Sequence, residues 1–371
     1  DYVLCWGDSV LNKKQKRQFY RDGYIVIKKA VAPELIESAL GRIRSAKKGE
    51  NLGAEPVMTD LLNKSSLTPI LTDMIGDFDP PIACQVGVIK PRKAGDHFNN
   101  IGYRDKDMPY YGAETHMDGS ITIAQPQEVQ EGTPQEIYQR YFASGPKGDL
   151  GRSADVIGHN MVPMFEDPDM TLGLGSFTAF AFVCLNDQTR EGCGQTALLR
   201  GAHHAVEKFF RKQRDINNAL GPEGPGWPRL DYQSPNRCGL VYLPQEVRDQ
   251  FIDETSEKTP DGRRWPRPTQ ILMEPGDACI TTFHIPHSGT RNEHGTESRK
   301  NIIFRLRSKS RQPDKMVNGV SDHPDRGQMG EWLEYEEGND PWERSKFAMC
   351  NMWHEWVGMK EVVAEQQALY N

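Results

Sequence analysis

The stretch over residues 177–185 is the clearest structural signal in the chain, because nine residues, Phe-Thr-Ala-Phe-Ala-Phe-Val-Cys-Leu, pass without a charge. An apolar run of this length between polar segments predicts a buried strand. Its aromatic rings are expected in the core, with Phe182 lining a cavity. Residues 301–307 alternate apolar and polar side chains, which predicts a second strand with one inward face. The chain is therefore expected to be organised around a sheet.

Shorter patterns extend this framework in both directions. Helices are predicted over residues 11–22, from Pro33, and over 67–75 and 207–218. Further strands are predicted over residues 24–27, 81–91, 196–199 and 270–273. A last helix is expected to start at Asp340, with a proline at its first position. Its bulky face should pack on the body of the protein or on a second subunit, and comprises Phe347, Met349, Cys350, Trp353, Trp356 and Val357.

The overall composition excludes some classes of partner. The 371 residues carry a net charge of -7, with a pI near 5.9. Nucleic acids and anionic membranes repel an acidic surface, so neither is expected as a partner. No apolar run approaches the roughly 20 residues of a membrane helix. The seven cysteines include no CxxC pair, which indicates a reducing compartment and predicts a cytoplasmic protein. The sequence begins at Asp1, and whether a targeting peptide was removed before this residue stays an open question.

A histidine and a carboxylate two residues apart give the first functional signal, in His116-Met117-Asp118. In an extended segment residues i and i+2 point to the same face, so both side chains would reach one metal ion. The motif is short enough to arise by chance, so the rest of the sequence has to indicate whether it binds a metal. Downstream, a second histidine ends one strand and an arginine begins the next, within residues 276–299. Two histidines and a carboxylate suit non-haem Fe(II), and open zinc sites use the same ligands.

Other polar residues are secondary candidates. Gln85 and Lys90, in the strand over residues 81–91, are placed to reach a bound acid, although Lys90 at a strand end is equally well explained as solvated. The adjacent His203 and His204 follow a turn, on which their side chains should diverge, and a structural role is predicted for them. Two long polar, proline-rich segments near residues 125–170 and 220–267 are predicted to cover a binding site.

Taken in order, four blocks of the sequence resemble the phytanoyl-CoA dioxygenase family of Fe(II)/2-oxoglutarate-dependent oxygenases, over about residues 11–306. The first block is the helix and strand over residues 19–27, and the second is His116-Met117-Asp118. The third spans residues 182–203. The fourth is the closing pattern of Gly276-Asp277, His287, Asn292 and Arg299. Each block is modest alone, and their order and spacing make the resemblance.

The resemblance implies a mainly β protein with flanking helices, in which a double-stranded β-helix, the cupin-like jelly roll, forms the core. A single domain would fill residues 1–371. Its N-terminal helices and first strand would lie within residues 11–80, its jelly-roll core within 81–307 and a helical extension within 308–371. A homodimer through that extension is one expectation.

The resemblance also implies roles for individual residues. His116, Asp118 and His287 would bind Fe(II) as the catalytic centre, and Arg299 would pair with the distal carboxylate of 2-oxoglutarate. His284 and His294 are rivals of His287, and Arg305, on the same strand face, is the rival of Arg299. Gln85, Lys90, Thr290 and Phe182 complete the predicted co-substrate site.

Two departures from the family pattern affect these roles. The proline that usually precedes the Gly-Ser-His closure is Arg200 here. The small polar residue usually found two positions after the distal histidine is Gly289, so either Ser288 or Thr290 would supply the hydroxyl that touches the co-substrate.

The chemistry implied is oxidation, by default hydroxylation, of an unactivated carbon in a small organic molecule, with 2-oxoglutarate and dioxygen as co-substrates and succinate and CO2 as products. Asp118 argues against a halogenase, which needs a small residue there. Desaturation, ring formation and epimerisation use the same ligands. Two alternatives from other classes stay open: a cupin-type isomerase or hydrolase without 2-oxoglutarate, and a catalytically silent binding protein. Lys90, Arg92 and Lys93 are a thin basic patch for a coenzyme A thioester, so a free metabolite is preferred.

Overall fold

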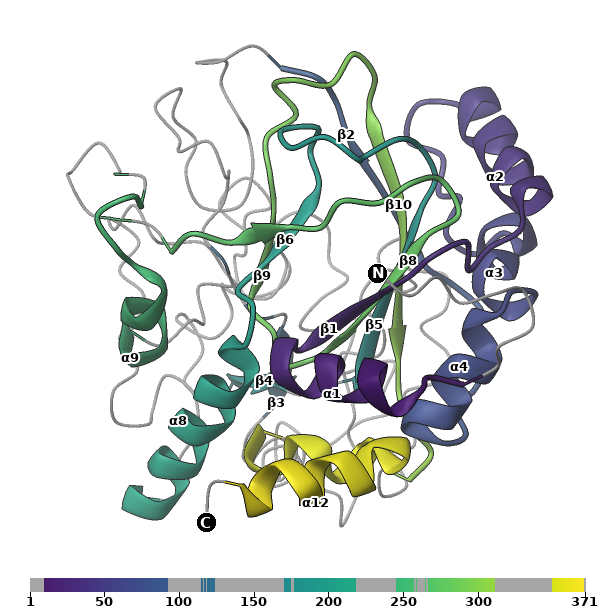
Figure 1. The fold of residues 1–371 in the computed structure, drawn as a ribbon. Helices are drawn as coiled ribbons and strands as arrows, with labels where there is room; N and C mark the ends of the chain where they lie inside the picture. Colours follow the sequence, from purple (N-terminus) through teal and green to yellow (C-terminus); the bar gives the residue numbers. More distant parts are fainter. Residues whose placement is uncertain are drawn as a thin grey trace.

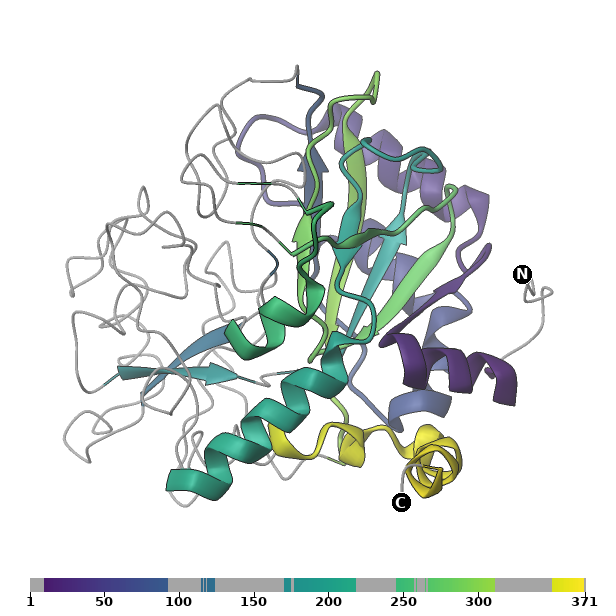
Figure 2. The ribbon, with the colours of Figure 1, turned by 60° about the vertical axis from the view of Figure 1, so that its left-hand side comes forward.

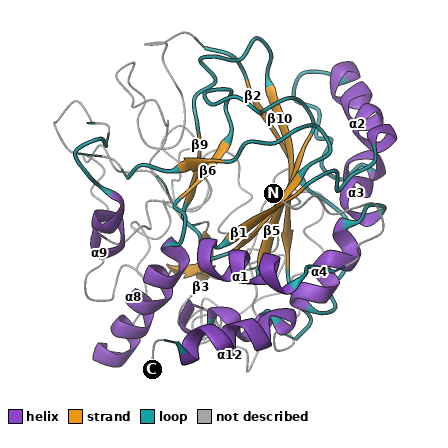
Figure 3. Cartoon of the chain, in the orientation of Figure 1, coloured by secondary structure: helices purple, strands orange, loops and turns teal. Residues whose placement is uncertain are grey.

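The structure is a computed structural model that describes residues 10–92, 115, 117, 119–123, 170–174, 177–217, 245–256, 258, 264, 266–310 and 349–369. In these parts of the chain, antiparallel sheets are flanked by helices (Figures 1 and 3). The prediction of a mainly β protein with flanking helices is confirmed at this level. None of the described helices is long and apolar enough to cross a bilayer.

A five-stranded sheet is the centre of the molecule, with strand order β1-β8-β5-β10-β2. All its pairings are antiparallel. Its strands are β1 (Tyr24–Ile27), β2 (Gln85–Ile89), β5 (Ala179–Cys184), β8 (Ala278–Thr282) and β10 (Arg299–Leu306). The central strand β5 is buried at every position, as its uninterrupted apolar sequence predicts. The sheet therefore joins residues from both ends of the described chain.

Helices cover one face of this sheet. Figures 1 and 2 show α2 (Pro33–Ser45), α3 (Pro56–Asn63) and α4 (Leu67–Ile75) along that side. The sheet residues that meet them are apolar and come from alternate positions of each strand, which face the same way. Those residues, all in one buried cluster with the helices, include Ala181, Val183, Ile280, Ile302, Phe304 and Leu306. This outer face is an ordinary hydrophobic core.

A second, three-stranded sheet has the order β7-β6-β9. It consists of β6 (Thr196–Leu198), β7 (Thr269–Gln270) and β9 (His287–Gly289), again antiparallel. A separate apolar cluster joins the two sheets, since it contains Phe180, Phe182 and Cys279 of the large sheet together with Leu198 of the small one. A third pair, β3 (Gly119–Ile123) with β4 (Met170–Leu174), lies apart from both.

The remaining described helices lie around the sheets. They are α1 (Lys13–Asp22), α8 (Ala202–Asn217), α9 (Gln245–Arg248) and α12 (Lys360–Ala368), with 3-10 turns at Asp249–Phe251, Met352–Glu355 and Val357–Met359. Helix α1 starts at a capping box formed by Asn12 and Gln15. It ends at Gly23, whose φ of 78° is accessible to glycine at little cost.

The C-terminal segment packs on the same chain. Trp353 and Trp356 lie against Phe19, with ring centroids 6.0 and 4.7 Å away. Helix α12 pairs its acidic residues with α1, in the contacts Lys13–Glu361, Lys13–Glu365 and Arg17–Glu365. Four residues of the predicted bulky face, Met349, Cys350, Trp353 and Trp356, are therefore buried within the chain, whereas Phe347 lies outside the described residues. The continuous helix predicted there is wrong in the described part, because Met352–Glu355 and Val357–Met359 are 3-10 turns. The backbone at Gly358 also lies so close to Asp73 that no side chain fits there.

Candidate active site

The space between the two sheets holds both the distal histidine and the candidate anchor arginine. His287 is the first residue of β9, and Arg299 is the first residue of β10. Gly289 follows His287 by two positions, so both face the same way from β9. A Cβ atom placed on Gly289 would lie 3.9 Å from Nη2 of Arg299. The imidazole and the guanidinium therefore extend toward the same region, because Gly289 shares a strand face with His287 and adjoins Arg299.

Arg299 is buried, with 5% of its surface exposed. Its Nε–H donates to the carbonyl of Gly194 at 2.7 Å. Among the described residues, no carboxylate forms an ion pair with it. Burial lowers the pKa of Arg299 to about 10, so the group stays charged at neutral pH. Burying a charge without a counter-ion costs on the order of several kcal/mol, which indicates that an anion is the missing partner.

Three glycines leave room around this guanidinium. A Cβ on Gly87, in the neighbouring strand β2, would lie 3.1 Å from Nη1. A Cβ on Gly194 would lie 3.3 Å from the Cβ of Arg299, and Gly194 has a φ of 81°. Gly289 is the third. The departure from the family pattern at Gly289 thus coincides with a need for space beside Arg299, which sequence reasoning missed.

His287 is half-buried, and one nitrogen of its ring lies near a backbone carbonyl. Its Nδ1 lies 3.3 Å from the carbonyl oxygen of Ile285. A histidine that donates from Nδ1 to a carbonyl presents Nε2 as a neutral ligand, which is the usual arrangement of a metal-binding imidazole. The ring also meets Phe180 edge-on, with centroids 5.0 Å apart.

Gln85 and Arg305 form a second polar pair on the same sheet face. Nη1 of Arg305 donates to Oε1 of Gln85 at 3.1 Å. The guanidinium carbon lies 5.1 Å from the ring centroid of Phe180 and 5.8 Å from that of Phe177. Phe182, in the same apolar cluster, is 2% exposed. Gln85 and Phe182 therefore lie on the inner face of the large sheet, and their roles in a co-substrate site stay a prediction.

The other predicted residues are placed as follows. Lys90 follows β2 and is exposed, as the solvated interpretation predicts. The hydroxyl of Thr290 donates to the carbonyl of Gln195 at 2.9 Å, a backbone-supporting contact. His294 is exposed in the β9–β10 turn, near the carbonyl of Glu191, whereas His284 is buried beside the His203 ring. Neither of these two histidines lies on β9.

His116 and Asp118, the other two predicted metal ligands, lie outside the described residues. Their neighbour Met117 is fully buried, and β3 begins at Gly119. No cluster of three potential ligands is found within the described ranges. The metal triad therefore stays a prediction.

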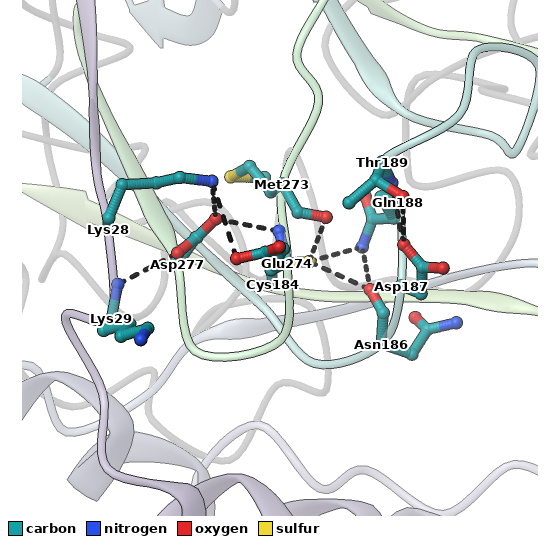
Figure 4. Close-up of polar contacts among 10 residues, drawn as sticks. All are labelled: Lys28, Lys29, Cys184, Asn186, Asp187, Gln188, Thr189, Met273, Glu274 and Asp277. Carbon is teal, nitrogen blue, oxygen red and sulfur yellow. Dashed lines mark hydrogen bonds and ion pairs between the residues drawn. The ribbon is translucent and has the colours of Figure 1, made fainter. Parts of the chain in front are cut away.

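Asp277 and Asn292, both part of the closing pattern, serve structure. The buried carboxylate of Asp277 accepts from Lys28 Nζ at 2.6 Å, from the Lys29 backbone at 2.9 Å and from the Glu274 backbone at 2.8 Å (Figure 4). Nδ2 of Asn292 donates to the carbonyls of Ile89 and Glu297. These contacts hold the β1–β8 corner and fix the β9–β10 turn against the end of β2.

His203 and His204 do not diverge, contrary to the prediction. They occupy the first turn of α8, which begins five residues before the predicted helix, and their ring centroids lie 4.0 Å apart. Each Nε2 lies 2.8 Å from the carbonyl oxygen of Tyr20. Burial lowers the pKa of both histidines, and for His203 the nearby His204 and His284 lower the pKa further, although the Tyr20 contact opposes these effects. The pair joins α8 to α1, so the structural role predicted for it is borne out by its contacts.

The described cysteines are free thiols, and four of the five are buried. Burial raises the pKa of Cys84 and of Cys184 to about 12 and also raises the pKa of Cys279. Thiols with raised pKa values are unreactive, because the thiolate is the nucleophile.

Comparisons with known proteins give no close relative. No family model and no curated protein matches the chain. Among solved structures, it is similar to HygX from Streptomyces hygroscopicus with nickel and 2-oxoglutarate bound, at 15% identity and a TM-score of 0.40, over 81% of this chain and 88% of that one. It is also similar to the non-heme alpha-ketoglutarate-dependent carbocyclase SnoK from nogalamycin biosynthesis, at 11% identity and a TM-score of 0.36, over 79% and 83%. Likenesses at this level carry no argument about the chemistry of this chain.

Proposed function

We propose that this protein is an Fe(II)- and 2-oxoglutarate-dependent dioxygenase of the phytanoyl-CoA dioxygenase type. It would oxidise, by default hydroxylate, an unactivated carbon of a small organic molecule, and release succinate and CO2. Its two sheets would form the jelly roll of that family. His116, Asp118 and His287 would hold the metal, and Arg299 would hold the co-substrate.

One observation carries the proposal: a buried guanidinium, with no carboxylate partner among the described residues, lies next to Gly289, two positions after His287. A planar guanidinium binds a carboxylate through two parallel N–H···O contacts and stays charged when buried. A dicarboxylic co-substrate would supply the missing anion and, at its other end, reach the metal beside the imidazole. A cupin-type enzyme without 2-oxoglutarate leaves Arg299 unexplained, and so does a silent binder of neutral ligands.

Two observations on the described residues support this placement of the metal and the co-substrate. His287 has its Nδ1 at a backbone carbonyl, which suits Nε2 coordination, and glycines at positions 87 and 289 open the space at the guanidinium. Bound Fe(II) would supply the activation of dioxygen, coupled to decarboxylation of 2-oxoglutarate. The chain itself would orient the co-substrate through Arg299 and exclude water with the rings of Phe180 and Phe182.

The test is succinate formation from 2-oxoglutarate by anaerobically iron-loaded protein after exposure to air, with and without a pooled metabolite library. Turnover that a library fraction stimulates is expected. Arg299→Gln should abolish it, whereas Lys300→Gln, one position along β10 and facing the other way, should retain it. Iron loading of His116→Ala should fall below that of the wild type. Stoichiometric iron binding at His287 without succinate formation under any condition would overturn the proposal in favour of the cupin-type alternative.

A further inference from the structure

Strand β10 carries two guanidinium groups on its inner face, and the proposed function uses only one. Arg299 and Arg305 are six residues apart, and alternation along a strand directs both to the same side. The register agrees, because Arg305 lies opposite Phe180 of β5, and Phe180 belongs to the cluster between the sheets. Arg299 and Arg305 are rival candidates for the carboxylate of 2-oxoglutarate. Their positions are better explained by two separate binding sites, one at each guanidinium.

The surroundings of Arg305 are built to hold a flat cation in place. The rings of Phe177 and Phe180 lie under the guanidinium, with their own centroids 4.3 Å apart. Gln85 fixes the plane of the group through its Oε1 acceptor. Because that amide accepts with its oxygen, its NH2 group is a further donor next to the guanidinium. An arginine and an amide side by side present donors that match a carboxylate.

The ring of Phe180 also sets an upper limit on the distance between Arg305 and His287, a proposed metal ligand. The ring of Phe180 lies about 5 Å from both the Arg305 guanidinium carbon and the His287 ring centroid. The charge of Arg305 is therefore at most about 10 Å from the imidazole. The guanidinium of Arg299, by contrast, lies next to Gly289 of β9 and Gly87 of β2. The two guanidinium groups therefore have different surroundings.

From this geometry we infer that Arg305, together with Gln85, binds an acidic group of the primary substrate, and that the substrate is a carboxylic acid. This inference rests on the proposed function and adds a substrate class to it. Arg305 is a specificity residue here, and Arg299 keeps the co-substrate. The acidic group would lie beside the guanidinium, whose orientation is held by the rings of Phe177 and Phe180.

The test uses a panel of small aliphatic and aromatic carboxylic acids, each paired with its methyl ester. Each probe is titrated anaerobically into protein that holds Fe(II) and saturating 2-oxoglutarate, so that the Arg299 site is already filled. Binding is read from the visible charge-transfer absorption of the complex and from the melting temperature. The variants are Arg305→Gln, Arg305→Lys as the charge-conserving change, and Lys300→Gln as the matched control on the opposite face of β10.

We expect at least one acid to bind the wild type tenfold or more tightly than its ester. Arg305→Gln should remove that preference, Arg305→Lys should restore part of it, and Lys300→Gln should leave it unchanged. The affinity for 2-oxoglutarate should change less than threefold in Arg305→Gln. If no acid is preferred over its ester by the wild type, or if Arg305→Gln loses 2-oxoglutarate, the inference is overturned. Failure of the proposed function would look different, because 2-oxoglutarate would then not bind the wild type at all.

Discussion

The two faces of strand β10 contrast sharply. Toward the helices it presents Ile302, Phe304 and Leu306, all buried in one apolar cluster. Toward the second sheet it presents Arg299, Asn301, Ile303 and Arg305, of which the first two are buried and only Ile303 is apolar. The outer face follows the general rule that cores are apolar, and the inner face departs from it. Since stability alone would favour apolar residues on both faces, the inner face is where function is expected to be located.

The strongest test of this contrast removes a ring from the outer face. Phe304→Ala should lower the free energy of unfolding by about 3–5 kcal/mol, because it deletes a fully buried aromatic side chain and leaves a cavity. Urea denaturation at 25 °C measures this loss. The folded fraction should still bind 2-oxoglutarate within twofold of the wild type. A loss below about 1 kcal/mol would show that the outer face does not hold the sheet.

The second test removes the charge from the inner face. Arg299→Met should weaken 2-oxoglutarate binding by about 100-fold, since two charge-assisted hydrogen bonds are lost. The ligand-free protein should melt at the same or a higher temperature, because a buried charge without a described partner is gone. Calorimetric titration and thermal melting measure the two quantities. A large drop in melting temperature would instead make Arg299 a structural residue.

The third test concerns His203 and His204, which link α1 to α8. Their pKa values are lowered in the folded protein, chiefly by burial, so the unfolded chain binds more protons below about pH 6.5. Their contribution to stability is therefore complete above that pH and is lost as the pH falls, by up to about 1.4 kcal/mol per pH unit for each histidine. Denaturation curves between pH 7.5 and about 5 measure this slope.

His203→Gln should reduce the slope, whereas His294→Gln, an exposed histidine, should not. The neighbouring Asp22 does not interfere. Burial works to raise its pKa, but hydrogen bonds from Arg21 and Arg200 prevail and hold the pKa below its usual 3.8. Equal slopes in the His203 variant and the wild type would contradict the assignment.

The smallest expected effect is at Gly289. A Cβ there would approach Cδ1 of Ile89 to 3.2 Å and Nη2 of Arg299 to 3.9 Å. Gly289→Ala should therefore raise the KM for 2-oxoglutarate about threefold, with a change in unfolding free energy below about 1 kcal/mol. Steady-state succinate kinetics would show it. An unchanged KM would mean that the space at Gly289 is not used by the co-substrate.

Local patterns predicted much of the fold. Strand β1 and helix α4 have the predicted bounds, and β5 and β10 lie within a residue or two of theirs. Helix α3, with a short apolar sequence after Pro56, was not predicted. The prediction also failed where backbone segments approach each other. The position of Gly358 against Asp73 is invisible in a helical pattern, and so is the shared carbonyl that draws His203 and His204 together.

For the site, the family resemblance selected His287 and Arg299, and the structure places Gly289, two residues after His287, next to the Arg299 guanidinium. The roles of both residues stay predictions. The counter-ion deficit at Arg299 was not predictable, because burial and the absence of a described partner are properties of the folded chain. The pairing of Gln85 with Arg305 was likewise hidden, since it joins strands 220 residues apart in sequence. The alternation of side chains along a strand predicts the face on which a residue lies. It does not predict which residue of another strand lies beside it.

The contact of Phe19 with Trp353 and Trp356 also has a consequence for biosynthesis. These rings close one hydrophobic cluster from opposite ends of the described chain, and β1 pairs with β8 over a similarly long separation. During translation the first helix and strand leave the ribosome long before their partners exist. We therefore expect the apolar sides of α1 and β1 to stay exposed until the segment around Trp353 has been synthesised.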